Sequence, residues 1–211
     1  GLFLADGNAR DFSGSVSITK EEPSVREFAK QWFDKYGITY REVVKVVEEN
    51  DEGLIVGKST SIVGNSSLFA RFLDALVGSG ARNKYIPNEA YTAPEEFVVG
   101  LLGGYFSGDG SIDVRTGIVT VTSASYKLIE GISHLCARIG VFGRITKNQP
   151  MNTNIRGNCK PAIVNRLTIR LHWARRFASK INLIEVNKAA KLKEILTLSP
   201  TSKFKFEEQN G

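Results

Sequence analysis

The sequence has few of the residues from which disulfide scaffolds and zinc sites are built, and it has no long hydrophobic run. Of 211 residues only two are cysteines, Cys136 and Cys159, and only two are histidines, His134 and His172. Two cysteines imply no disulfide framework, and the isolated histidines lack the spacing of a zinc site. No apolar stretch is long enough to cross a bilayer, and no signal peptide is visible. We therefore expect an intracellular protein, cytoplasmic or organellar, with no membrane partner.

Positive charge is concentrated in one half of the chain. Residues 1–97 contain 11 Lys and Arg against 15 Asp and Glu, a net charge of −4, whereas residues 98–211 contain 17 against 7, a net charge of +10. A basic half of this kind indicates a polyanionic partner, with nucleic acid as the leading candidate. A solvated basic surface without a partner explains the charge alone equally well.

A short pattern occurs twice and reveals an internal duplication. Ala5-Asp6-Gly7 ends an apolar run, and the segment 102–110, LGGYFSGDG, repeats the arrangement 103 residues later. Similar residues continue to match at this offset, and later at an offset of 104. Two copies of about a hundred residues suggest a pseudo-dimer within one chain. We expect a first half at 1–93, a second half at 94–198 and a tail at 199–211.

Hydrophobic periodicity predicts the same order of elements in both halves: helix, strand, helix, strand, strand, helix. This order predicts an α+β fold of two pseudo-symmetric αβαββα-type halves, each with an antiparallel sheet covered by helices on one face. After the first motif we expect strands at 14–20, 39–48 and 54–63 and helices at 22–36 and 69–77. After the second we expect strands at 118–122, 141–148 and 163–171, a loop at about 149–161, and helices at 126–139, 173–181 and 188–196.

The helix that carries the second motif is unusually rich in glycine. Each glycine in a helix interior costs roughly 1 kcal/mol relative to alanine. Such a helix is typical of very close contact with another backbone, although relief of crowding in an ordinary core is an alternative. We further expect Gly7 and Gly110 to end the two helices in the left-handed conformation. The helix glycines are Gly100, Gly103, Gly104 and Gly108.

The paired Asp-Gly sequences predict a metal site. An aspartate at the end of a helix lies among carbonyl groups that carry the negative end of the helix dipole, so it favours a bound cation. Two such helices side by side would bring Asp6 and Asp109 together in an all-oxygen site that suits Mg²⁺. A lone Asp-Gly is usually a simple turn, but the matched offset favours a functional pair.

On these residues the chain resembles the LAGLIDADG homing endonucleases. The segment 102–110 is similar to the whole LAGLIDADG motif, and residues 1–7 are similar to its last seven positions. The resemblance implies a saddle of two antiparallel sheets that grips a long DNA site in the major groove. It also implies that Asp6 and Asp109 bind Mg²⁺, with Mn²⁺ as a substitute, and drive cleavage of both strands. Leu4 and Ser107 replace the other aspartate of the motif, a position that varies in the family.

Two lysines are candidates for a catalytic role under this resemblance. Intein-borne members often have a lysine before Ile-Pro late in the first half, and the segment 83–87, NKYIP, fits this pattern with Lys84. Lys188 is its counterpart in the second half, without the Ile-Pro. A lysine near the scissile phosphate can stabilise developing charge or help to polarise the nucleophile. Taken singly, each lysine could be a surface charge.

DNA contacts are expected from the polar faces of the strands. In residues 163–171, Ile163, Leu167, Ile169 and Leu171 are predicted to face the core and Val164, Arg166, Thr168 and Arg170 to face outward. A two-stranded ribbon fits the major groove, where arginine pairs with guanine. The candidate DNA contacts are Arg10, Arg41, Lys45, Lys58, Arg115, Arg144, Lys147, Arg166, Thr168 and Arg170.

The sequence therefore predicts a monomeric, Mg²⁺-dependent, site-specific double-strand DNA endonuclease, encoded within an intein or an intron. The chain begins with glycine and ends with Gln209-Asn210-Gly211, so no splicing residues are visible. If the protein comes from an intein, we expect that only the nuclease insert is present. The alternatives are a DNA-binding protein of the same fold that does not cleave, and a maturase that assists RNA splicing.

Overall fold

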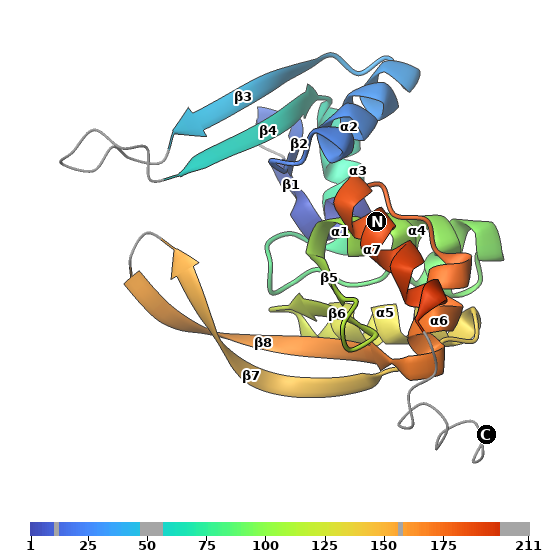
Figure 1. Ribbon diagram of the computed structural model, residues 1–211. Helices are drawn as coiled ribbons and strands as arrows, with labels where there is room; N and C mark the ends of the chain where they lie inside the picture. The colour runs from blue at the N-terminus through green and yellow to red at the C-terminus, as the bar shows by residue number, and fades with distance from the viewer. Residues whose placement is uncertain (11–12, 47–56, 156–157, 199–211) are drawn as a thin grey trace.

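The structure is a computed structural model that describes residues 1–10, 13–46, 57–155 and 158–198 (Figure 1). The predicted tail at 199–211 lies outside the described residues. The first half contains α1 (Leu2–Asp6), β1 (Gly7–Arg10), β2 (Ser15–Thr19), α2 (Pro23–Lys35), β3 (Tyr40–Val46), β4 (Lys58–Asn65) and α3 (Ser67–Val77). The second half contains α4 (Glu95–Asp109), β5 (Gly110–Asp113), β6 (Ile118–Ser123), α5 (Tyr126–Arg138), β7 (Arg144–Ile155), β8 (Asn158–Arg170) and α6 (Leu171–Lys180). A 3₁₀ turn, η2 (Asn88–Tyr91), precedes α4, and α7 (Val186–Thr197) follows α6.

The strands form two four-stranded antiparallel sheets with the same topology. Their orders are β1-β2-β4-β3 and β5-β6-β8-β7. The registers also match, because Gly7 pairs with Ile18 and Gly110 pairs with Val121, each 103 residues later. In Figure 1 the β3–β4 and β7–β8 ribbons project to the same side of the molecule, away from most of the helices. The predicted α+β fold of two pseudo-symmetric halves is confirmed.

Each half contains one strand more than the predicted order. The additional strands, β1 and β5, begin immediately after the two aspartates and have four residues each. A strand this short offers too few alternating positions to be recognised from periodicity. Its effect is large, since the chain passes directly from each motif helix into a sheet.

The β7–β8 ribbon is longer than the sequence suggested. The expected loop at 149–161 was wrong, because β7 runs to Ile155 and β8 begins at Asn158. The pairing shifts at a bulge between Thr146 and Gln149. Next to this bulge the expected exposure is reversed at two positions of β8, where Ile163 is 63% exposed and Val164 only 6%. A bulge bends and twists a ribbon, which is why alternation read from its inner end fails farther out.

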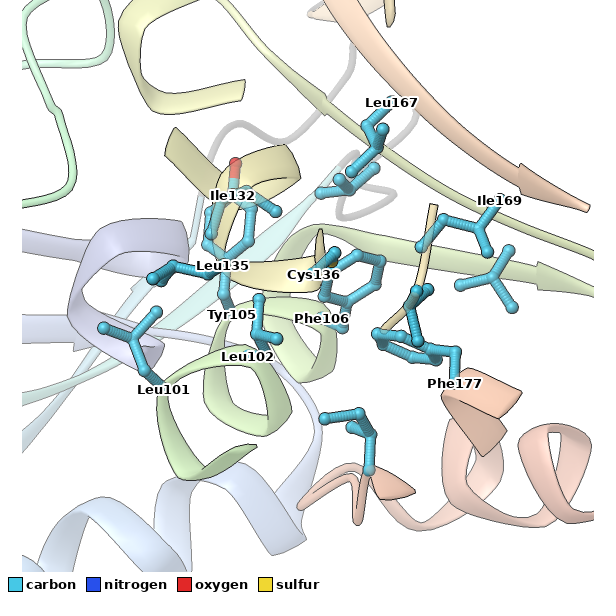
Figure 2. Packing of buried hydrophobic residues seen from close by; sticks show 14 of the residues in the cluster. Leu101, Leu102, Tyr105, Phe106, Ile132, Leu135, Cys136, Leu167, Ile169 and Phe177 are labelled. Carbon is cyan, nitrogen blue, oxygen red and sulfur yellow. The ribbon is translucent and has the colours of Figure 1, made fainter. Parts of the chain in front are cut away.

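Helices cover one face of each sheet and enclose the core. The larger hydrophobic cluster is centred on α4, from which Leu102, Tyr105 and Phe106 point toward α5, β8 and α6 (Figure 2). The first half has a smaller cluster, in which Val16 and Ile62 of the sheet pack against α2 and α3. No helix among the described residues is long and apolar enough to cross a membrane.

The glycines of α4 allow other backbone segments to approach the helix. A β-carbon on Gly104 would lie 2.8 Å from the amide nitrogen of Leu2, and one on Gly103 would lie 2.5 Å from the carbonyl oxygen of Asn182. A β-carbon on Gly108 would collide with Ala5 of α1. The expected close contact with another backbone is therefore confirmed at Gly103 and Gly104, whereas Gly108 faces side-chain atoms. The expectation was wrong for Gly100, where a β-carbon would meet nothing within 4 Å.

Candidate active site

The two candidate aspartates are the last residues of α1 and α4, as expected from the sequence. The glycines that follow them are extended, however, with φ −89° and ψ 150° at Gly7 and φ −70° and ψ 147° at Gly110. The predicted left-handed conformation was therefore wrong, because the chain continues straight into β1 and β5. Glycine is needed at these two positions because there is no room for a side chain. A β-carbon at either position would collide with the backbone of the residue four places earlier.

The carboxylate of Asp6 lies against the last turn of α4. A β-carbon on Gly108 would lie 2.5 Å from Oδ2 of Asp6, so the two helix ends are in contact at the acidic residues. Burial, together with the negative charge of Asp6, raises the pKa of Asp109 to about 6, although Lys20, Lys84 and Lys188 oppose the shift. The structure thus brings both predicted carboxylates into one partly buried site that favours cations.

Lys84 caps the end of α1 from a buried position. Its side chain is only 6% exposed, and Nζ donates hydrogen bonds to the carbonyl oxygens of Phe3 at 2.8 Å, Leu4 at 3.0 Å and Gly7 at 2.7 Å. Burial lowers the pKa of Lys84, while Asp109 and Asp6 oppose this effect. The hydroxyl of Ser125, which caps α5, donates to the Lys84 carbonyl at 2.6 Å and holds the main chain in place. An ammonium group has three protons, and here three carbonyls accept them.

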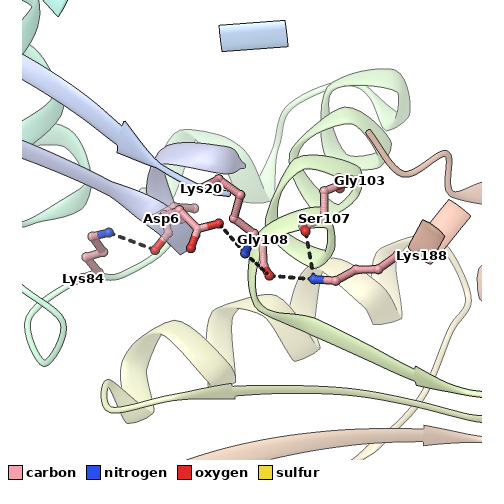
Figure 3. Close-up of polar contacts among 8 residues, drawn as sticks. Asp6, Lys20, Lys84, Gly103, Ser107, Gly108 and Lys188 are labelled. Carbon is pink, nitrogen blue, oxygen red and sulfur yellow. Dashed lines mark hydrogen bonds and ion pairs between the residues drawn. The ribbon is translucent and has the colours of Figure 1, made fainter. Parts of the chain in front are cut away.

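Lys188 has the equivalent position at the end of α4 (Figure 3). Its Nζ donates to the carbonyl oxygens of Ser107 at 2.9 Å and Gly108 at 2.7 Å. Glu185 caps α7 by accepting from the amide of Lys188 at 3.1 Å, which fixes the start of the helix that carries the lysine. Burial, followed by the charge of Lys20, lowers the pKa of Lys188. Each half therefore supplies one lysine that donates hydrogen bonds to main-chain carbonyl groups close to its own aspartate.

Lys20 is a third cation at the site, and the sequence interpretation missed it. It follows β2, and its Nζ lies 3.0 Å from Oδ2 of Asp6 and donates to the carbonyl oxygen of Gly108 at 2.8 Å (Figure 3). A signal was present in the sequence, since Lys20 continues the alternation of Val16 and Ile18, whose side chains face the core. A lysine on the buried, apolar face of a strand needs an acceptor for its charge within the protein, because burying an unpaired charge is costly.

The residues present suit a hard divalent cation. Among the described residues no group of three or more His, Cys, Asp and Glu side chains could hold a metal. Mg²⁺, however, is commonly held by one or two carboxylates and completes its shell with water and substrate phosphates. Asp6 and Asp109 are such a pair, and the raised pKa of Asp109 reflects its burial and the nearby charge of Asp6, both of which a bound divalent ion would offset. The carbonyl groups at the helix ends are less available as metal ligands, because they already accept hydrogen bonds from the three lysines.

Most of the candidate DNA contacts share one face of each sheet. The strand registers align Arg41 with Ser17 and Asn8 in the first sheet, and Arg144 with Thr168, Thr120 and Ser111 in the second. The intervening rows belong to the core, so these residues lie on the face away from the helices, here called the polar face. Of the sequence candidates, this face includes Arg10, Arg41, Lys45, Arg144, Arg166, Thr168 and Arg170, while Arg115 lies in the β5–β6 turn.

Besides Arg115, two candidates do not lie on the polar face. Lys58 pairs with Val46 and has the same phase along β4 as the buried Thr60 and Ile62, so it lies on the helix-side face. Lys147 turns toward α5, where its Nζ lies 3.9 Å from the ring centroid of Tyr126. The predicted strand ranges did not show which face of the sheet these two lysines would occupy, because the alternation of side chains near the ends of the ribbons could not be read from the sequence.

Comparison with known sequences identifies the motif. Residues 96–182, from α4 to the end of α6, match the model of the LAGLIDADG-like domain. This part of the second half is therefore similar to the LAGLIDADG-like domain. The chain is also similar to DNA-directed RNA polymerase subunit Rpo1C of Methanocaldococcus jannaschii, with 29% identity over 93% of this chain and 20% of the relative. DNA polymerase II large subunit of Thermococcus kodakarensis is 31% identical over 76% of this chain and 8% of the relative. The chain thus spans a fifth or less of the length of these two relatives.

Solved structures show the same fold. WhiA from Thermotoga maritima aligns with a TM-score of 0.59 and 12% identity, over 99% of this chain and 63% of that chain. The homing endonuclease I-DmoI, in complex with DNA and Mn, aligns with a TM-score of 0.53 and 13% identity, over 85% and 91% of the two chains. I-WcaI bound to its DNA recognition sequence aligns with a TM-score of 0.55 and 14% identity, over 85% and 76%. The resemblance to LAGLIDADG homing endonucleases is confirmed.

Proposed function

We propose that this protein is a site-specific DNA endonuclease that hydrolyses both strands of a long recognition site with a divalent metal. The observation that carries the proposal is the meeting of two aspartate-terminated helices. Asp6 lies against Gly108, and the charge of Asp6 contributes to the raised pKa of Asp109. Two carboxylates kept close in a partly buried site are costly without a cation.

In the proposed reaction Asp6 and Asp109 hold Mg²⁺, for which Mn²⁺ can substitute. The ion would supply Lewis acidity and a bound water of lowered pKa. Lys84 and Lys188 bond to the carbonyl groups behind the aspartates, so their first role is to fix the two carboxylates in position. Their positive charges also favour the approach of a phosphate group.

The polar face of the two sheets is the proposed DNA interface. The arginines on this face are Arg10, Arg41, Arg144, Arg166 and Arg170, and they project from strands rather than from loops. A two-stranded ribbon can enter the major groove, and arginine reads guanine there through two hydrogen bonds. The internal pseudo-symmetry supplies both halves of the interface from one chain, which supports action as a monomer.

The matched proteins support an origin as an inserted element, and we propose an intein. An RNA polymerase subunit, a DNA polymerase subunit and a protein described as a translation initiation factor each match over only 20%, 8% and 6% of their lengths. These names describe unrelated tasks. A segment shared by such different proteins is typical of a mobile insertion rather than of a common activity.

A second candidate is a protein that binds nucleic acid without cutting it, either a DNA-binding protein or a maturase. The lysine network favours this alternative, because Lys20 and Lys188 already bond to the Gly108 carbonyl and Lys20 pairs with Asp6. A site whose charges are balanced internally does not require a metal for its stability.

The experiment first selects a cleavable sequence from a random DNA library with Mg²⁺. Cleavage of the selected site is then measured under single-turnover conditions for the wild type and for Asp109→Asn, beside a binding titration in Ca²⁺. We expect Asp109→Asn to abolish cleavage and to retain DNA binding. Asp34→Asn, which changes an exposed aspartate of α2 by the same charge, should cleave normally. Selection of bound but never of cleaved DNA would favour the second candidate, and normal cleavage by Asp109→Asn would remove this residue from the site.

A further inference from the structure

The ammonium group of Lys20 lies between the ends of α1 and α4, at a position where a metal cation would also be expected to bind. Its Nζ contacts an oxygen from each half, Oδ2 of Asp6 at 3.0 Å and the carbonyl oxygen of Gly108 at 2.8 Å. Gly108 directly precedes Asp109 and is in the last turn of α4. The ammonium group therefore bridges α1 and α4 at the acidic end of both helices.

Two features make Lys20 the most weakly held of the three lysines. Its side chain is 23% exposed, whereas the buried Lys84 donates to three carbonyls. Lys20 also shares its carbonyl acceptor, since Lys188 donates to the same Gly108 oxygen at 2.7 Å. Two ammonium groups on one oxygen repel each other, and the charge of Lys20 lowers the pKa of Lys188. Lys20 can relieve this repulsion by turning into solvent.

The position is asymmetric between the halves. The offset of 103 that relates Gly7–Ile18 to Gly110–Val121 places Ser123 where the first half has Lys20. Ser123 accepts a hydrogen bond from the amide of Ser125 at 3.1 Å and brings no charge. The bridging ammonium group of Lys20 is thus specific to the first half and does not follow from the duplication of the fold.

We propose that Lys20 is an internal competitor of the divalent metal: its ammonium group holds the cation position in the metal-free protein and is displaced when the ion binds. A divalent ion coordinated by Asp6 would lie within a few ångströms of Nζ, so the two positive charges exclude each other. Lys20 stabilises the paired acids without metal and weakens metal affinity in the absence of DNA. This inference rests on the proposed metal-dependent function and adds a regulatory element to its site.

The test measures Mn²⁺ binding to the DNA-free protein by electron paramagnetic resonance, with no cleavage reaction involved. Lys20→Met removes the charge and keeps the length of the side chain, and we expect it to bind Mn²⁺ at least fivefold more tightly than the wild type. Lys20→Arg keeps the charge and should gain no affinity. The matched control is Lys180→Met, which removes the same charge from the Lys180–Glu95 ion pair at the opposite end of α4. It should bind Mn²⁺ as the wild type does.

A second measurement uses the unmodified protein and so does not depend on the folding of a variant. Acylation of individual lysines by acetic anhydride is followed by mass spectrometry with and without Mn²⁺. The ion should increase labelling of Lys20, while the buried Lys84 stays slow in both states. Equal Mn²⁺ affinity of Lys20→Met and wild type, or unchanged labelling of Lys20, overturns the proposal and leaves the nuclease assignment intact. Absence of Mn²⁺ binding by every variant would overturn both.

Discussion

The amide nitrogen of Leu2 lies 2.8 Å from the point that a β-carbon on Gly104 would occupy, so α1 and α4 meet through their backbones. The same surface continues to Gly108, which faces Asp6. Side chains of ordinary size would hold the helices apart and separate the two aspartates. The glycines of α4 are therefore part of the site as well as of the fold.

Gly104→Ala should destabilise the protein, because the added methyl group meets backbone atoms that cannot move aside. Overpacking of this kind costs about 1–3 kcal/mol of unfolding free energy. The control is Gly100→Ala in the same helix, where the methyl group would meet open space. Alanine is the better helix former by up to about 1 kcal/mol, so Gly100→Ala should stabilise the protein. Urea denaturation measures both. Equal effects of the two substitutions would show that helix propensity, and not close packing, determines the result.

The duplication made much of the fold predictable. The matched Asp-Gly sequences predicted where both motif helices end, and periodicity predicted the other helices and six of the eight strands. Residue spacing carries this information because the same 103-residue offset relates the sequences and the sheet registers. The sequence did not predict β1 and β5, because four residues are too few to show the alternation typical of a strand.

Much of the site depends on contacts that sequence patterns do not contain. Lys20 lies 88 residues from Gly108, and nothing near either residue indicates that they meet. The placement of Lys84 beside α1 likewise depends on tertiary packing, although the motif pointed to the residue. The opposite faces of Lys45 and Lys58 follow from the β3–β4 register, which pairs Lys45 with Ser59 and Lys58 with Val46 and could not be read from the sequence.

The ionisation of Asp109 should make the metal-free protein less stable as the pH rises. The pKa of this carboxyl is about 6 in the folded protein and 3.8 ordinarily, so the folded state binds the proton more tightly. The free energy of unfolding should then fall as the pH rises from about 4 to 6, because a raised carboxyl pKa favours the folded state only while the group is protonated. Asp109→Asn should remove this loss and be more stable than the wild type at pH 7 by about 1–3 kcal/mol.

Urea denaturation across this pH range, without metal, tests the prediction. Near pH 4 the two proteins should have similar stability. Mn²⁺ at neutral pH should stabilise the wild type and leave Asp109→Asn unchanged, because only a ligand that binds the folded state adds stability. A wild type that gains stability with rising pH over the same interval would contradict the assignment of a buried, repelled carboxylate.

Lys84 should contribute to stability as well as to cleavage. Lys84→Met removes three hydrogen bonds to helix-end carbonyls, and we expect a loss of about 2–4 kcal/mol of unfolding free energy, since bonds from charged donors are the stronger ones. Lys188→Met should lose less, because Lys188 donates to two carbonyls and is more exposed. Lys127→Met, an exposed lysine of α5, is the control. Single-turnover cleavage at saturating enzyme should also slow by ~10²-fold in Lys84→Met. An unchanged rate with weaker DNA binding would make Lys84 a backbone anchor only.

Two lysines on one ribbon can show which face meets the DNA. Lys45 pairs with Ser59 and lies on the polar face, while Lys58 pairs with Val46 and lies on the helix-side face, and both side chains are exposed. DNA affinity should fall steeply with salt, and each lost phosphate contact lowers the slope of log K against log salt by about 0.9. We expect this decrease for Lys45→Ala and none for Lys58→Ala, measured by fluorescence anisotropy in Ca²⁺. Because the substitutions remove the same charge from adjacent positions, a difference between them reports the face and not the net charge. Equal slopes for the two variants would remove the polar face of this ribbon from the DNA interface.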